Sequence, residues 1–128
     1  MIHGVGTDIV AIARIERMLA DHGERAAAKL LAPAEMERYR QASRPAAFLA
    51  KRFAAKEALG KALGLGLRDP ATLHNIAVQS DGIGRPSFDY APPLADWMQA
   101  RHLRAHLSLS DEVDTAMAFV VVEEEDTP

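Results

Sequence analysis

The stretch from Phe48 to Gly66 constrains the fold more than any other part of the chain. Its apolar spacing predicts one long helix, because at about 100° per residue a set of apolar side chains falls within roughly 60° of arc. That stripe consists of Phe48, Ala55, Leu59, Ala62 and Leu63. Glu57 projects about 180° away from it, with Phe53 and Lys61 about 40° to either side of Glu57. A solvated ion pair explains the two charges but not the Phe53 ring, so this face is either functional or an interface.

The composition is that of one globular domain covering residues 1–128. An apolar fraction of 48% and a charged fraction of 26% argue against disorder. The net charge of −3 is too small and too mixed to favour a nucleic-acid partner. Without cysteine, the chain has no disulfides, thiolate metal sites or cysteine nucleophiles. It shows neither a signal sequence nor an apolar run long enough to span a membrane, so we expect a cytoplasmic protein.

The order of the predicted elements indicates an α+β fold, with one strand and then helices first, and a small antiparallel sheet after them. A strand over 2–10 is followed by helices over 11–22, 24–31 and 34–41 and by the long helix. Further strands are predicted over 75–80, 85–90, 104–110 and 116–122, with a short helix from 92 to 102 between the second and third. The last strand is apolar on both faces. In so small a domain, this predicts that another subunit covers one face.

Asp8 stands at the end of the first strand, after Gly4 and Gly6. Glycines in a strand let a second backbone or a ligand come close. Asp8 is either a functional carboxylate or the N-cap of the helix that follows. Together with Glu57 it would supply two oxygen ligands without cysteine or paired histidines, a set that suits Mg²⁺. That ion keeps several waters and usually completes its shell with substrate phosphates.

Cations on the long helix fit the same interpretation. Arg52, Lys56 and Lys61 lie along the helix that carries Glu57, and such groups are suited to binding phosphate. The residue types therefore raise the hypothesis of a magnesium–phosphate site, and the simpler alternative, a solvated helix face, stays open.

Four motifs then resemble the holo-acyl-carrier-protein synthase family, and they occur in the family's order over nearly the whole chain. GVGTDIV (4–10) resembles the family's G-[IV]-G-[TS]-D opening. RFAAKEA (52–58), followed by Lys61 and GLG (64–66), is similar to its RFAAKEAxxKAxGxG helix, the most specific of the four. DGIGRP (81–86) and HLSLS (106–110) resemble its D-x-x-G-x-P turn and its H-V-S-L-S strand.

The resemblance implies a 4′-phosphopantetheinyl transferase with that family's fold. Such an enzyme moves the phosphopantetheine arm of coenzyme A to a serine of apo acyl carrier protein, in fatty acid biosynthesis, and releases adenosine 3′,5′-bisphosphate. By position, Asp8 and Glu57 would be ligands of Mg²⁺, and Lys61 would bind the phosphates. The other implied coenzyme contacts are Arg52, Lys56, Gly64, Gly66, Arg85, Pro86, His106 and Ser108. The family is typically a homotrimer with active sites between subunits, which would account for Phe53 and for the last strand.

The resemblance also implies a docking surface for the carrier protein. Arg14 and Met18 of the first helix match the positions at which the family contacts the acidic helix of that partner. An ordinary exposed arginine is the simpler alternative for Arg14. A structural role is likewise the alternative for His106.

Two positions depart from the family pattern. Asp111 stands where a histidine is usual, so either another cation binds the coenzyme there or coenzyme binding differs in detail. Ala32 replaces the usual Thr or Ser before Pro33, which predicts a weaker helix cap. Two other functions also stay open: a binding module for coenzyme A or carrier protein without turnover, and a magnesium-dependent phosphoesterase. The group that takes the serine proton is open among Asp8, Glu57 and a water.

Overall fold

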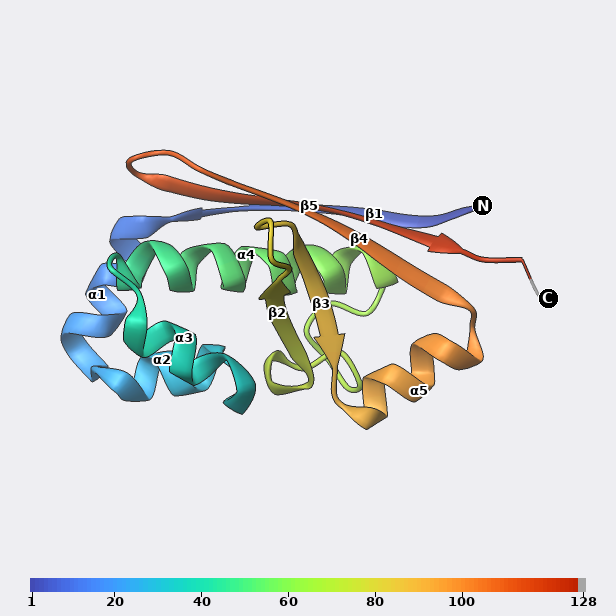
Figure 1. Ribbon diagram of the computed structural model, residues 1–128, viewed down its shortest axis with the longest axis horizontal. Coiled ribbons are helices and arrows are strands. Elements are labelled where there is room, and N and C mark those ends of the chain that lie inside the picture. The colour runs from blue at the N-terminus through green and yellow to red at the C-terminus, as the bar shows by residue number, and fades with distance from the viewer. Residues whose placement is uncertain (127–128) are drawn as a thin grey trace.

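One long helix, α4, occupies the centre of the molecule, and the other elements pack around it (Figure 1). The computed structural model describes residues 1–126. Helix α4 runs from Pro45 to Leu63, with proline in the first turn, where its missing N–H leaves no hydrogen bond unmade. It ends at Gly64, whose φ of 79° is left-handed. Buried residues occur on every side of α4, so the prediction of a single buried stripe is wrong.

Three strands form an antiparallel sheet that lies along one side of α4 (Figure 1). They are β1 (Ile2–Ala11), β4 (Leu103–Asp111) and β5 (Thr115–Glu124), in the order β1-β5-β4. In the register, Thr7 pairs with Phe119, and Phe119 pairs with Ser108. The first strand of the chain therefore joins the last two, although more than a hundred residues separate Thr7 from its partner.

The remaining elements lie mainly below the sheet in the view of Figure 1, and some of those that follow α4 also contact β4. Before α4 they are α1 (Ile12–His22), α2 (Glu24–Leu30), the 3₁₀ turn η1 (Pro33–Glu35) and α3 (Met36–Gln41). After α4 they are the 3₁₀ turn η2 (Leu73–Asn75), the hairpin strands β2 (Ile76–Ser80) and β3 (Pro86–Tyr90), and α5 (Pro92–Ala100). The predicted α+β class is confirmed, but the strands form two separate sheets. Within residues 1–126, no helix combines the length and apolarity needed to cross a membrane.

Two glycines bring β1 into backbone contact with α4. Alternate residues of a strand face one way, so Gly4, Gly6 and Asp8 share the face that lies on the helix. A Cβ atom at Gly4 would overlap the carbonyl oxygen of Ala62, and one at Gly6 would overlap that of Ala58. The glycines therefore serve the approach of a second backbone, one of the two predicted roles. The contact also sets Asp8 against α4.

The two faces of β5 have different environments. One face packs on α4 through Ala116, Ala118, Val120 and Val122, all fully buried. On the other face, Met117 and Phe119 are 44% and 43% exposed. Val5 and Ile9 of β1 continue this exposed apolar surface, because they pair beside Val121 and Met117. The doubly apolar pattern of the last strand thus corresponds to one buried face and one open apolar face.

Replacing Gly6 by alanine should destabilise the protein by about 2–3 kcal/mol, because the added methyl group forces β1 away from the Ala58 carbonyl. Urea unfolding followed by circular dichroism measures this change. Gly82→Ala is the matched control, since a Cβ atom there meets nothing within 4 Å. Equal unfolding midpoints for Gly6→Ala and the native chain would contradict the proposed backbone contact.

Candidate active site

Strand β1 and helix α4 bring Asp8, Glu57 and Lys61 together. The Lys61 ammonium lies 3.4 Å from the Asp8 carboxylate and donates a 2.8 Å hydrogen bond to the Thr7 carbonyl. Glu57 lies one helical turn before Lys61, on the same face of α4. The alternative that Asp8 caps helix α1 is excluded, because the N-cap residue of α1 is Ala11 and no side chain makes a capping hydrogen bond there.

The two carboxylates are close enough to influence one another. Partial burial raises the pKa of Glu57, and the negative charge of Asp8 raises it further. The positive charges of Lys61 and Arg14 act in the opposite direction on the same pKa. The Asp8 side chain is only 16% exposed, whereas that of Lys61 is 53% exposed. Two acidic groups are thus held together at some electrostatic cost, a pattern typical of functional sites.

The donor set fits a small hard cation. Asp8 and Glu57 offer carboxylate oxygens, and the Lys61 ammonium already stands beside Asp8 as a positive group. Among residues 1–126, no group of three or more His, Cys, Asp or Glu side chains is placed to hold a metal ion. A cation bound here would have to take its remaining ligands from water or from a substrate. Mg²⁺ binds in this way, with few protein carboxylates and with phosphate oxygens.

Phe53 is covered within this chain. It is 8% exposed, and the Arg14 guanidinium of α1 stacks over its ring, 5.7 Å from the centroid. The prediction that Phe53 reports a subunit interface is therefore wrong, because α1 supplies the missing cover. The same contact places the charge of Arg14 near Glu57, while Met18 lies one turn further along α1 and is half-buried.

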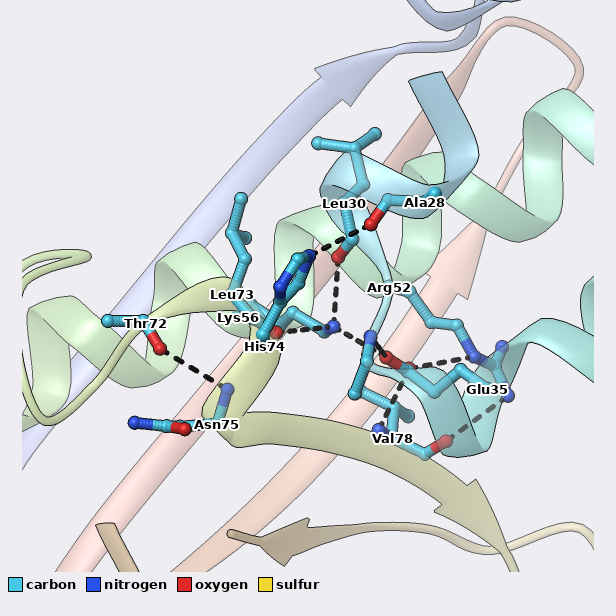
Figure 2. A network of polar contacts seen from close by, with 11 residues as sticks. Ala28, Leu30, Glu35, Arg52, Lys56, Thr72, Leu73, His74, Asn75 and Val78 are labelled. Atoms are coloured by element: carbon cyan, nitrogen blue, oxygen red, sulfur yellow. Dashed lines mark hydrogen bonds and ion pairs between the residues drawn. The ribbon is translucent and has the colours of Figure 1, made fainter. Parts of the chain in front are cut away.

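Lys56 and Arg52 do not face this site. Lys56 is fully buried, and its ammonium donates to the carbonyls of Leu30 and Leu73, each at 2.9 Å, and to the Glu35 carboxylate (Figure 2). Arg52 is 6% exposed and lies beside the same carboxylate, with Nε 3.3 Å from Oε2. All three ammonium protons of Lys56 are used inside the protein. Its predicted role in binding phosphate is therefore wrong, and the position of Arg52 argues against the same role for that residue.

Glu35 is the centre of this buried network, which joins elements that are distant in sequence (Figure 2). Its carboxylate also accepts hydrogen bonds from the backbone N–H groups of Ala32 at 2.8 Å and Val78 at 3.0 Å. The first bond is the half of a capping box in which the N3 side chain accepts from the N-cap N–H, and Ala32 cannot supply the other half from its own side chain. Glu35 is not among the site residues predicted from the sequence. Its place three residues after Ala32, the residue before the proline that opens the turn, was the one available signal.

Glu35→Gln should destabilise the fold by about 3–5 kcal/mol, because it leaves the cations of Lys56 and Arg52 buried without a countercharge. Chemical denaturation measures the loss. Glu37→Gln, at an exposed position of α3, is the matched control and should change stability by no more than about 0.5 kcal/mol. A Glu35→Gln variant as stable as this control would show that the network contributes little.

Gly64 and Gly66 shape the end of α4. Both have left-handed φ values, 79° and 67°, which glycine adopts without strain. The N–H groups of Leu65 and Gly66 each donate to the Gly60 carbonyl at 3.0 Å, so the chain turns back on the helix. This geometry accounts for both glycines. Arg85 and Pro86 are also predicted coenzyme contacts. Arg85 ends the exposed turn between β2 and β3, and Pro86 is the first residue of β3.

His106 and Ser108 lie on the sheet face opposite to the one that carries Asp8. They project from the outer side of β4 and are exposed, whereas the intervening Leu107 packs toward the core. The His106 Nε2 is 2.7 Å from the Glu123 carboxylate of β5, and this contact lowers the pKa of Glu123. Within one chain these residues therefore cannot join Asp8 and Glu57.

Asp111 faces two cations. Its carboxylate lies 3.7 Å from the Arg44 guanidinium and 3.5 Å from the Lys51 ammonium. These residues border a hollow of about 280 Å³ at the start of α4. The acid that replaces the expected histidine is thus balanced by Arg44 and Lys51, two partners that the sequence analysis did not identify.

Known proteins resemble this chain in sequence and in fold. A model of the 4′-phosphopantetheinyl transferase superfamily matches residues 4–119. Holo-[acyl-carrier-protein] synthase from Azoarcus sp. (strain BH72) is 56% identical over 123 residues, covering 96% of this chain and 98% of that protein. The crystal structure of the enzyme of that name from Neisseria meningitidis has a TM-score of 0.93 at 46% identity, covering 96% and 99% of the two chains. The structure from Bacillus anthracis str. Ames, in complex with CoA (3′,5′-ADP), has a TM-score of 0.81 at 34% identity, covering 98% and 99%.

The matched region contains Asp8, Glu57 and Lys61, and the structural likeness extends over nearly the whole molecule. The sequence and the fold therefore both match this family. The chain belongs to the 4′-phosphopantetheinyl transferase superfamily.

Proposed function

We propose that this protein transfers the 4′-phosphopantetheine arm of coenzyme A to a serine of an apo acyl carrier protein, in fatty acid biosynthesis. The observation that carries the proposal is the pair of interacting carboxylates, Asp8 and Glu57, with the Lys61 ammonium beside them. The activity named for the relatives supports it, as does the coenzyme bound in the Bacillus anthracis structure. The cytoplasmic location stays a prediction.

In this proposal Asp8 and Glu57 would hold Mg²⁺, which when bound supplies positive charge to the phosphate oxygens. Lys61 binds phosphate oxygens as well and stabilises the negative charge that develops on the leaving group. The serine oxygen bonds to the phosphorus that carries the pantetheine arm. The bond from this phosphorus to the adenosine bisphosphate oxygen breaks, and the serine proton passes to a carboxylate or water of the site.

Helix α1 is the proposed docking surface for the carrier protein. Arg14 is exposed beside the site and Met18 borders a hollow of about 300 Å³ between α1 and α2. His22, Arg25 and Lys29 line the same hollow and give it a basic rim. An acidic helix with apolar side chains is complementary to this surface in both charge and polarity.

The proposed reaction is tested by the intact mass of an apo acyl carrier protein after incubation with this protein, coenzyme A and Mg²⁺. We expect the carrier to gain the mass of one phosphopantetheine group, and EDTA to abolish the gain. An unchanged mass with coenzyme A still bound would favour a binding module instead. Release of adenosine bisphosphate without carrier modification would favour a phosphoesterase.

Glu57→Gln should lower the transfer rate by about 100-fold or more, because it removes one charged ligand of the proposed metal site. The same variant should unfold at a higher temperature than the native chain in EDTA at pH 7. The reason is that the raised pKa of Glu57 marks its ionised form as unfavourable in the folded protein. This unfavourable contribution to stability is present above the raised pKa of Glu57, so the difference in Tm should vanish as the pH falls and Glu57 takes up a proton.

Scanning calorimetry across pH, combined with the mass assay, checks both effects of this variant. Glu37→Gln on α3 is the control, expected to leave the transfer rate and the Tm unchanged. Full transfer by Glu57→Gln at saturating Mg²⁺ would contradict the proposal that Glu57 is a metal ligand. A lower Tm would instead point to a structural role for the carboxylate.

We also propose that the exposed apolar face of the three-stranded sheet joins copies of this chain into a homotrimer. Val5, Ile9, Met117 and Phe119 form a contiguous apolar surface of the kind that marks an interface. In such an assembly, residues of the outer face, such as His106, can reach the site of a neighbouring subunit. This would reconcile the predicted role of His106 with its position away from Asp8 within one chain.

Phe119→Glu should convert a trimer into monomers and abolish transfer, because it places a charge in the centre of the proposed interface. Light scattering after size-exclusion chromatography should give about three times the 13.9 kDa chain mass for the native protein. Ile83→Glu is the control, since Ile83 is 88% exposed but lies in the turn between β2 and β3. A native protein that is active as a monomer would refute the assembly.

A further inference from the structure

Lys61 contacts Asp8 directly, in a site where Lys61 is also the proposed phosphate ligand. Its ammonium is 3.4 Å from the carboxylate and holds its position through a 2.8 Å hydrogen bond to the Thr7 carbonyl. Thr7 and Asp8 are adjacent residues of β1, which is the edge strand of its sheet. A side chain from α4 thus satisfies both a carboxylate and a carbonyl at the edge of β1.

A divalent cation and this ammonium would compete for the same oxygen. A metal ion bound to Asp8 would place two positive charges within a few ångströms of the Lys61 nitrogen, and such charges repel strongly at short range. The 3.4 Å contact is loose, and the Lys61 side chain is 53% exposed. A loose, exposed ion pair of this kind is weak, and the flexible lysine arm can move to a new partner.

We propose that Lys61 is an exchangeable counter-cation: a divalent cation displaces its ammonium from Asp8, and the released ammonium then binds a phosphate group of the substrate. The inference rests on the proposed transferase function and adds an order of events to it. In the absence of metal, Lys61 neutralises part of the charge of the carboxylate pair. With metal bound, the same group is free for phosphate, so the cation and the phosphate compound favour each other's binding, and linkage makes this effect reciprocal.

The first test is the affinity of the full-length protein for Mn²⁺ alone, measured by electron paramagnetic resonance without coenzyme. Lys61→Met should bind Mn²⁺ about threefold to fivefold more tightly than the native chain, because no ammonium competes for Asp8. Lys61→Arg, which keeps the positive charge, should retain the native affinity. The exposed position of residue 61 makes unfolding of these variants an unimportant concern.

Lys51→Met is the matched control for the loss of one positive charge. Lys51 lies on the same helix but pairs with Asp111, so this variant should bind Mn²⁺ with native affinity. An equal gain for Lys51→Met and Lys61→Met would overturn the proposal, because it would show a general charge effect. Native affinity in Lys61→Met would also overturn it, as would the absence of Mn²⁺ binding in every variant.

The second test is the coupling between Mn²⁺ and adenosine 3′,5′-bisphosphate, measured by calorimetry. Saturating Mn²⁺ should raise the affinity of the native chain for this bisphosphate, and the factor should be about threefold to fivefold smaller in Lys61→Met. Unchanged coupling in Lys61→Met would overturn the exchange. Neither measurement contains a carrier protein, so failure of the exchange stays distinct from failure of the proposed transfer reaction.

Discussion

The contact between the backbone of β1 and the backbone of α4 is the constraint on which the candidate site depends. Gly4 and Gly6 allow the strand to rest on the carbonyl oxygens of Ala62 and Ala58, with no side chain between them. Asp8 follows on the same face of the strand, so its carboxylate lies against the helix beside Glu57 and Lys61. Any residue larger than glycine would move β1 outward and separate the two halves of the site.

Helix α4 combines two kinds of charged residue that sequence alone does not distinguish. Lys56 and Glu57 are adjacent in sequence, yet Lys56 has a structural role and Glu57 belongs to the candidate site. Lys56 is buried and joins α2, η1 and η2 through hydrogen bonds to Leu30, Glu35 and Leu73. Glu57 is half-buried and faces Asp8. Adjacent residues of a helix project about 100° apart and lie about 1.5 Å apart along its axis. The buried network around Lys56 therefore also fixes the rotation and position of the helix that carries Glu57.

Local patterns in the sequence predicted the elements and the carboxylate pair, because hydrophobic period and residue type are local properties. They did not predict that buried residues occur on every side of α4, since small alanine side chains let neighbours approach a face that appears polar. The burial of Lys56 was missed because its countercharge, Glu35, lies 21 residues earlier. The cover of Phe53 by Arg14 was missed for the same reason.

The pairing of β1 with β5 also determines when the candidate site can exist during synthesis. The sole strand partner of β1 among the described residues is β5. Thr7 therefore cannot pair within the sheet until Phe119 has been synthesised. Contacts between such distant residues form late, because a long loop must close before they are made. A nascent chain that lacks β5 has no sheet to hold Asp8 against α4. The arrangement of Asp8 against α4 therefore forms only after residues Thr115–Glu124 have been synthesised.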